Sequence, residues 1–268
     1  MRDETGITGR LPGYRVVIIT LDSHAAGPAM RAMEHLTSDY PGLDLQVHAA
    51  AEWGESAEAF KAAEEAVRHG DIIIANLLFL EEHVARILPA LQARRDHCDA
   101  MIGIIADAEV VRLTRMGTLD MTAPPSTMGK LMKRLRGSSK PSTESGAKKM
   151  AMLRRLPKIL KLIPGKAQDL RAWFLVMQYW LGGSDDNVRA MVQFLLNRYA
   201  TDTARAKAPE AAAPIEYPET GLYHPGLPQR ITTDPGDIPG PVDATLTVGL
   251  IMLRSYVLSA DTAHYDGV

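Results

Sequence analysis

The chain has 268 residues, of which 46% are hydrophobic and 23% are charged, and its formal net charge is −2. This composition excludes a disordered polar chain and a collagen-like chain, and it allows one or two domains with a sizeable core. The single cysteine, Cys98, excludes a disulfide scaffold and a zinc site built on several cysteines, and suits a reducing compartment. The near-neutral charge gives no signature of nucleic-acid binding.

The N-terminal sequence, MRDETGITGR, is polar and lacks the apolar core of a signal peptide. The longest apolar runs, at residues 16–21 and 172–181, are too short to cross a bilayer, because ten helical residues rise only about 15 Å. We therefore expect a cytoplasmic protein, and a peripheral membrane contact stays open.

Strand and helix signals alternate through residues 14–120, which we expect to form an N-terminal α/β domain. Apolar runs rich in β-branched residues predict strands, and apolar residues at helical spacing predict helices. The expected strands are 14–21, 43–49, 71–75 and 100–106, and the expected helices are 25–36, 55–69, 80–95 and 109–116. This order predicts βαβ units and a doubly wound, mainly parallel sheet of the flavodoxin-like or Rossmann-like kind.

Ligands of such sheets bind beyond the carboxyl ends of the strands. The polar residues expected in this crevice are Asp22, Ser23, His24, Asn76 and Asp107. A structural interpretation is favoured at the first strand end, because Asp22 or Ser23 can cap the helix expected from Ala25. No G-x-S-x-G elbow surrounds Ser23, so nucleophilic catalysis by this turn is not expected.

The remaining chain divides by composition into four segments. Residues 121–147 are rich in Ser, Gly, Pro and cations, which predicts a flexible basic loop. Residues 148–200 are expected to be helical, and residues 201–243 carry eight of the seventeen prolines and predict an extended linker. Residues 244–252 predict a buried strand, which either joins the first sheet or starts a second α/β region at 244–268.

The apolar helix expected at residues 167–181 contains four aromatic residues: Trp173, Phe174, Tyr179 and Trp180. They could form a wall for a flat ligand, but their helical spacing favours core packing. Met30 likewise fits a core position. Ser184, followed by two aspartates, is expected to cap the next helix.

The residues from Lys130 to Lys166, here called the basic arm, contain twelve Lys and Arg residues and one acidic residue, Glu144. The rest of the chain is acidic, so the net charge of −2 hides an uneven distribution. The arm is able to bind carboxylates, an acidic protein face or an anionic membrane. The alternative is a solvated loop beside an ordinary amphipathic helix.

Metal and nucleotide motifs are weak in this sequence. Glu81, Glu82 and His83 open an expected helix, where adjacent carboxylates suit the helix dipole, and no further ligand follows at the spacing a metal needs. The sequence contains no phosphate loop, G-x-G-x-x-G turn, EF-hand loop or H-E-x-x-H motif. We therefore expect no metal site and no bound cofactor in these residues.

Long stretches of the chain resemble the N-terminal part of the porphyrin-binding H subunit of magnesium chelatase. They are PGYRVVIITLDSHAAGPAM (12–30), HAAAEWGE (48–55), GDIIIANLLFLEEHV (70–84) and LPKILKLIPGKAQDLRAWFLVMQYWLGGSDDN (156–187). The ending, VGLIMLRSYVLSADTAHYDGV, resembles the start of the region that this subunit shares with the cobaltochelatase large subunit.

The resemblance implies a subunit that binds protoporphyrin IX for ATP-dependent Mg²⁺ insertion in (bacterio)chlorophyll biosynthesis. It implies as partners an AAA+ ATPase subunit, which uses the ATP, and a third chelatase subunit. It leaves open a peripheral contact with a photosynthetic membrane. The family's subunit is several times longer than this chain, so we expect a fragment that lacks the chelation residues and is inactive alone.

Two roles remain for these residues. They either enclose part of the porphyrin or form a scaffold that docks the partner subunits, and the second is favoured because the aromatic residues are expected to be buried. An N-terminal part of a cobaltochelatase-type large subunit is the alternative family. The expected porphyrin or partner contacts are Lys133, Arg134, Arg136, Lys148, Lys149, Arg154 and Arg155.

Overall fold

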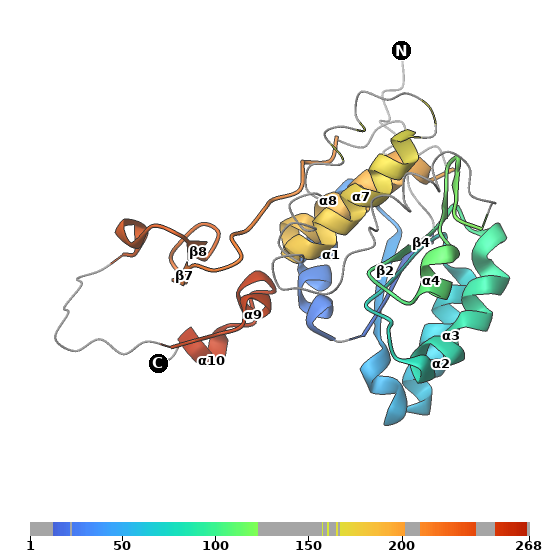
Figure 1. The fold of residues 1–268 in the computed structure, drawn as a ribbon, viewed down its shortest axis with the longest axis horizontal. Helices are drawn as coiled ribbons and strands as arrows, with labels where there is room; N and C mark the ends of the chain where they lie inside the picture. The colour runs from blue at the N-terminus through green and yellow to red at the C-terminus, as the bar shows by residue number, and fades with distance from the viewer. Residues whose placement is uncertain are drawn as a thin grey trace, which may run out of the picture.

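The computed structural model describes residues 13–21, 23–122, 157, 160, 165, 167–201, 210–239 and 250–266, without the side chain of His24. Within these residues a six-stranded sheet has the order β2-β1-β3-β4-β5-β6 (Figure 1). Its strands are β1 (Tyr14–Thr20), β2 (Leu43–Ala49), β3 (Ile72–Asn76), β4 (Ala100–Ile104), β5 (Arg115–Met116) and β6 (Leu119–Asp120). The pairs among β1–β4 are parallel and β5–β6 is an antiparallel hairpin on β4. The predicted doubly wound, mainly parallel α/β fold is confirmed.

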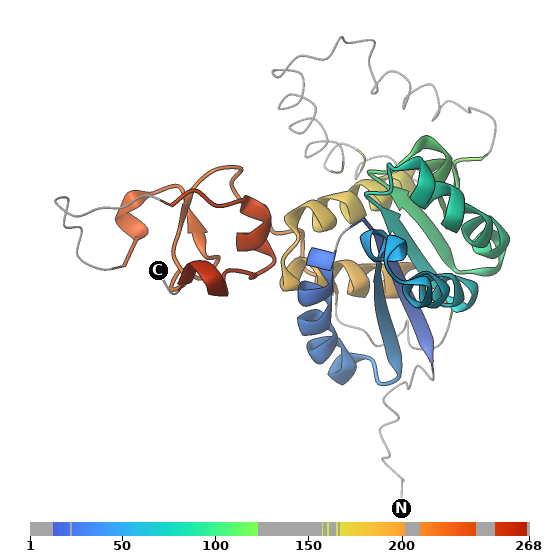
Figure 2. The same cartoon turned by 90° about the horizontal axis from the view of Figure 1, so that it is seen from below.

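Helices cover both faces of this sheet, as a parallel sheet requires. The helical elements are η1 (Ser23–Ala25), α1 (Ala26–Asp39), η2 (Ala50–Gly54), α2 (Ala57–His69), α3 (Glu81–Arg94), η3 (Arg95–His97), α4 (Ala108–Arg112), α7 (Ala167–Gly182) and α8 (Asp185–Tyr199). Helices α2 and α3 pack on one face, and α1, α7 and α8 share an apolar core with the other (Figure 2). Successive residues of the strands alternate between these two cores; Val16 and Ile18 face α1, whereas Val17 and Ile19 face α2.

The helical pair α7–α8 is therefore part of the same core as the sheet. Its aromatic residues pack there as predicted: Trp173, Phe174 and Tyr179 are buried and Trp180 is half-buried. The indole Nε1 of Trp173 donates to the carbonyl oxygen of Gly103 in β4 at 2.9 Å. The predicted cap is also confirmed, because the Ser184 hydroxyl accepts from the backbone N–H of Asn187.

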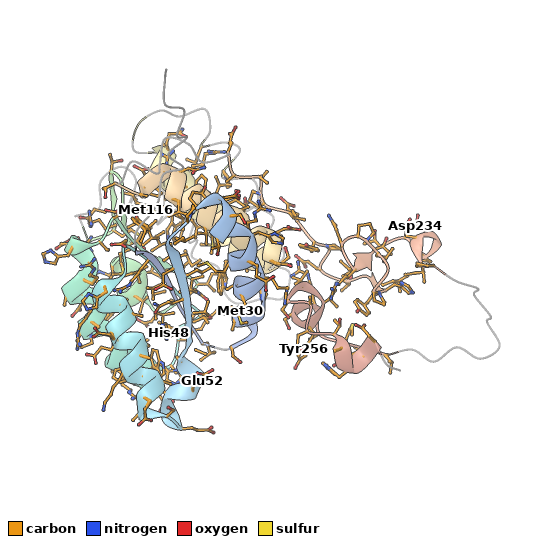
Figure 3. All side chains as sticks on the ribbon, turned by 180° about the vertical axis from the view of Figure 1, so that it is seen from behind. Met30, His48, Glu52, Met116, Asp234 and Tyr256 are labelled. Carbon is orange, nitrogen blue, oxygen red and sulfur yellow. The ribbon has the colours of Figure 1, made fainter. Side chains whose placement is uncertain are left out.

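The predictions for residues 109–116 and for Met30 are wrong. The helix expected at 109–116 ends at Arg112, because the chain turns back into the β5–β6 hairpin through Gly117, which has a φ of +56°. The hydroxyl of Thr114 bridges the N–H and C=O of Gly103, which holds the chain out of the helix. Met30, expected in the core, is 69% exposed on the outer side of α1 (Figure 3).

A smaller unit, formed by residues 217–239 and 250–266 and here called the C-terminal unit, lies beside α1 and away from α2 and α3 (Figures 1 and 2). Its elements are β7 (Leu222–Tyr223), β8 (Ile231–Thr232), η5 (Pro235–Asp237), α9 (Arg254–Leu258) and α10 (Ala263–Asp266). The Tyr223 hydroxyl in the hairpin contacts Thr262 at 2.9 Å, so residues on both sides of the expected boundary at 243 pack together. Residues 244–249 of the expected strand lie outside the described residues, and 250–252 form no strand.

Of the expected linker, residues 210–216 lie along the helical pair, whereas residues 222–237 form the β7–β8 hairpin and η5. The side-chain amide of Asn187 forms a two-way hydrogen bond with the backbone of Ile215, at 3.0 and 2.8 Å. The Tyr179 hydroxyl donates to the carbonyl oxygen of Ala212 at 2.5 Å, and burial raises the pKa of Tyr179 to about 12. No helix within the described ranges is long and apolar enough to cross a membrane.

Replacement of Gly103 by alanine tests the contact between β4 and α4. A Cβ at Gly103 would lie against the carbonyl oxygen of Val110 and 2.8 Å from the Cα of Val111, so two backbone segments must separate. We expect Gly103→Ala to lower the free energy of unfolding by about 1–3 kcal/mol in urea titrations. Gly54→Ala is the control, since a Cβ there meets nothing within 4 Å. Equal stabilities of the two variants would contradict this packing.

Candidate functional site

The candidate site is the carboxyl edge of the sheet, where strands β1–β4 end. Strand β2 lies on one side of β1 and β3 on the other, so the winding reverses between β1 and β3. Such a reversal is where doubly wound proteins bind their ligands. Asn76, predicted for this crevice, ends β3 directly beside Thr20 of β1.

Asn76 and Thr20 are fully buried and bonded to each other. The Thr20 hydroxyl donates to Oδ1 of Asn76 at 3.0 Å, and Nδ2 of Asn76 donates to the carbonyl oxygen of Ile19 at 3.3 Å. A buried amide needs such partners, since leaving it unsatisfied costs about 1–3 kcal/mol. The polar groups at the reversal point therefore close β1 onto β3.

The backbone just beyond β3 and β4 is unusual. Leu77 and Ile105 have φ values of +53° and +46°, a region that non-glycine residues rarely adopt and that is a clear outlier for a β-branched side chain. The N–H of Leu77 donates to the carbonyl oxygen of Ile105 at 2.9 Å, and that of Asp107 to Leu78 at 2.8 Å. These bonds hold the two loops together against the backbone strain.

Asp107 caps α4 rather than facing Asn76. Its carboxylate accepts from the backbone N–H of Glu109 at 2.8 Å. Asn76 and Asp107 thus follow neighbouring strands, as predicted, but each is engaged in its own local hydrogen bond.

The first strand end differs from the prediction. Asp22 and the side chain of His24 lie outside the described residues, and Ser23 is exposed in η1. The N-cap of α1 is Ala25, without a side-chain cap bond, so the cap expected from Ser23 is wrong, and the cap expected from Asp22 falls on a residue outside the described ranges. The 3₁₀ turn between Ser23 and Ala25 moves the start of α1 beyond the reach of a cap at Ser23.

An aromatic cluster that was not predicted lies near this edge. Trp53 of η2 packs edge-to-face against Phe60 and His83, with ring centroids 5.4 and 5.8 Å apart. The Arg86 guanidinium lies 4.1 Å from the Phe60 ring centroid and donates to the carbonyl oxygen of Trp53. Glu81 and Glu82 occupy the first turn of α3, as predicted. This cluster joins η2 and α2 to α3.

Asp169 of α7 is a buried carboxylate at the opposite, amino edge of the sheet. One oxygen accepts from the N–H and hydroxyl of Thr118, at 2.8 and 2.7 Å. The other accepts from Arg198 and Tyr199, both at 2.9 Å. Burial opposes the charge of Asp169, but these hydrogen bonds outweigh it and hold the pKa below its usual range. A lone acidic residue in an apolar helix was the sequence signal for this role.

The amino edge carries two further structural carboxylates. Asp99 accepts from the Tyr14 hydroxyl at 2.6 Å and from Thr201, which ties β1 and the end of α8 to β4. Asp71 accepts from the N–H of Arg15 at 2.8 Å, and burial raises its pKa. Burial likewise raises the pKa of the Cys98 thiol, which disfavours the reactive thiolate.

The basic arm lies almost wholly outside the described residues. Of its residues, only Pro157, Leu160 and Gly165 are described, and Leu160 is buried in the core shared by α7 and α8. The predicted contacts are all outside the described ranges: Lys133, Arg134, Arg136, Lys148, Lys149, Arg154 and Arg155. Within those ranges, no three His, Cys, Asp or Glu residues are grouped to hold a metal ion.

Comparison with known families identifies the class of protein. Residues 15–174, which include all of the six-stranded sheet except Tyr14, match a family described as "Domain of unknown function (DUF3479)". The chain belongs to this family. Residues 177–268 match a second family, described as CobN/Magnesium Chelatase.

Similarity to individual proteins is more specific than the family matches. The chain is 58% identical over 268 residues to the magnesium-chelatase H subunit of Cereibacter sphaeroides, covering all of this chain and 22% of that protein. It is 57% identical over 256 residues to the H subunit of Rhodobacter capsulatus, covering 96% of this chain and 21% of the relative. The chloroplastic ChlH subunit of Oryza sativa is 27% identical over 281 residues, with coverages of 96% and 20%.

These similarities confirm the predicted resemblance to the N-terminal part of magnesium chelatase H subunits. The chain spans about a fifth of the length of these relatives.

Asp169→Asn tests the carboxylate at the amino edge. We expect a loss of about 2–3 kcal/mol of unfolding free energy at pH 7, because several hydrogen bonds to a charged group weaken. A carboxylate whose pKa is lower in the folded state stabilises fully above the unfolded value, near 3.9, and loses this contribution as the pH falls through the folded value.

The difference between Asp169→Asn and the unmodified chain should therefore shrink below about pH 4 in urea titrations. The exposed Asp186 is the control, since Asp186→Asn removes only a helix-dipole contribution of below about 1 kcal/mol. The same deficit for Asp169→Asn at pH 7 and pH 3 would disprove the electrostatic role.

Proposed function

We propose that the chain is the N-terminal portion of a magnesium chelatase H subunit, which binds protoporphyrin IX for ATP-dependent insertion of Mg²⁺ in (bacterio)chlorophyll biosynthesis. The observation that carries this proposal is the 58% identity to a magnesium-chelatase H subunit across all 268 residues. The match of residues 177–268 to the CobN/Magnesium Chelatase family supports the same assignment for the remainder of the chain.

Within that subunit, we propose that these residues act as a scaffold and docking module. The support is the use of polar groups where a ligand crevice was expected: Asn76 closes β1 onto β3, and Asp107 caps α4. Three of the four aromatic residues of α7, Trp173, Phe174 and Tyr179, are likewise buried in the core, so they are not displayed as a wall for a porphyrin ring. A porphyrin-enclosing role is the competing proposal.

In the proposed complex, Mg²⁺ and the porphyrin are substrates, and ATP is used by the AAA+ subunit with the help of a third subunit. These residues bind no cofactor in this proposal, and their contact with the partners runs through the cations of the basic arm. We place the complex in the cytoplasm, with a peripheral contact at the photosynthetic membrane.

A chimera tests the function. This chain replaces the matched N-terminal segment of the Cereibacter sphaeroides H subunit, and Mg-protoporphyrin formation is followed by fluorescence with the ATPase subunit, the third subunit and ATP. We expect activity within a few-fold of the unmodified H subunit, whereas the 268-residue chain alone forms no product. A folded chimera without activity would refute the assignment, and circular dichroism and size-exclusion chromatography establish that it is folded.

Charge reversal in the basic arm tests the docking role. We expect replacement of Lys133, Arg134 and Arg136 by glutamate in the chimera to weaken partner binding more at 50 mM than at 500 mM salt, because screening removes electrostatic contacts. The control reverses Lys61 and Arg68, which lie in α2 outside the arm. Porphyrin binding is measured in parallel by tryptophan quenching. Loss of porphyrin binding with unchanged partner binding would favour the porphyrin-enclosing role instead.

A further inference from the structure

The residues just before α9 show a conflict between sequence and environment. The apolar sequence around them predicts a buried strand, yet Ile251 is 100% exposed, Leu253 is 66% exposed and Leu250 is 57% exposed. Natural sequences rarely set local preference against environment, so such a conflict marks a surface that is covered in another assembly.

The backbone of this segment is also free to pair. Leu253 is the N-cap of α9, with φ and ψ values of −73° and 135°, so the segment enters the helix from an extended conformation. Among the described residues, Leu250, Ile251 and Met252 take part in no backbone hydrogen bond, and the carbonyl oxygen of Leu253 accepts from Tyr256 as α9 begins. A short apolar segment with unpaired N–H and C=O groups is a template for an added strand.

The segment is held in place at its C-terminal end. Arg254 donates to the carbonyl oxygens of Pro218 and Tyr217, at 2.7 and 3.1 Å. The end of α9 is fixed to the body, because Arg31 donates to the carbonyl oxygen of Ser259 at 2.7 Å and pairs with Asp185 at 3.1 Å. A template fixed in this way loses less conformational entropy when a partner strand binds.

The length of the relatives and the family match indicate which polypeptide covers this segment. The segment falls within the match to the CobN/Magnesium Chelatase family, and the chain corresponds to the N-terminal 22% of the Cereibacter sphaeroides H subunit. Most of the polypeptide in the relatives therefore follows the matched part. It is the nearest source of a further strand, because it is joined to this segment in the same molecule.

We propose that Leu250–Leu253 is an edge strand that pairs with a strand from the chelatase region beyond the matched part of an H subunit. Main-chain hydrogen bonds join the two strands, and the side chains of Ile251 and Leu253 enter an apolar surface on that region. This inference rests on the proposed membership of an H subunit, but it concerns assembly of the polypeptide rather than catalysis.

The test compares the 268-residue chain with the chimera described above, by hydrogen exchange and mass spectrometry. In the chain alone, the amides of residues 251–253 should exchange within seconds. In the chimera, we expect exchange there to be at least about 100-fold slower, because the amides are paired. Equal exchange in both proteins would overturn the proposal. Protection that grows with the concentration of the chain alone would assign the surface to a second copy and also overturn it.

A substitution gives a second readout. Ile251→Asp should leave the melting temperature of the chain alone unchanged, because this side chain is wholly exposed there, and should remove the protection in the chimera. Phe79→Asp is the matched control, since Phe79 is 54% exposed on the α/β unit. Retained protection in the Ile251→Asp chimera would contradict the proposal.

A second protein and a combined reading of activity and amide protection complete the test. If the chimera fails to fold, the same exchange measurement is made on the full-length Cereibacter sphaeroides H subunit, substituted at the residue aligned with Ile251. Protection in a chimera that forms no Mg-protoporphyrin would leave this inference standing and refute the proposed function. A chimera that forms Mg-protoporphyrin but shows no amide protection at residues 251–253 would support the proposed function and overturn this inference.

Discussion

The structure depends on one constraint: a parallel sheet must be covered on both faces. Helices α2 and α3 cover one face, but α1 alone covers only part of the other, and α7 and α8 complete it from beyond residue 160. The carboxylate of Asp169 fixes this cover, because its bonds to Thr118, Arg198 and Tyr199 join α7 and α8 to the β5–β6 hairpin. The helical pair is therefore an integral layer of the α/β unit.

The same constraint explains the division of roles between the two edges of the sheet. At the amino edge, buried carboxylates join strands to helices across long sequence separations, as Asp99 does between Tyr14 and Thr201. At the carboxyl edge, Thr20 and Asn76 satisfy each other, and the strained backbone at Leu77 and Ile105 is held by cross-loop bonds. The polar groups named at both edges are thus engaged in internal hydrogen bonds, as the scaffold role proposed above requires.

Hydrogen bonds also hold Ile215 of the linker and Ser259 of the C-terminal unit to the helices of the α/β unit. Asn187 holds the linker at Ile215, and Arg31 holds the end of α9 at Ser259. The Leu250–Leu253 segment is fixed at its C-terminal end and exposes apolar side chains that the described part of the unit does not cover.

The sequence by itself determined the parallel α/β class, the positions of β1–β4 within about two residues, the Ser184 cap and the burial of Trp173, because these follow from local periodicity and capping chemistry. It also carried the chelatase resemblance. Only the tertiary structure decided that Ala25 replaces Ser23 as the cap of α1, that Met30 is exposed and that Asn76 is used internally. Those outcomes depend on which distant elements pack together. The hydrogen-bond partners of Asp169 lie 29 to 51 residues away in the sequence, so a local sequence pattern does not identify them.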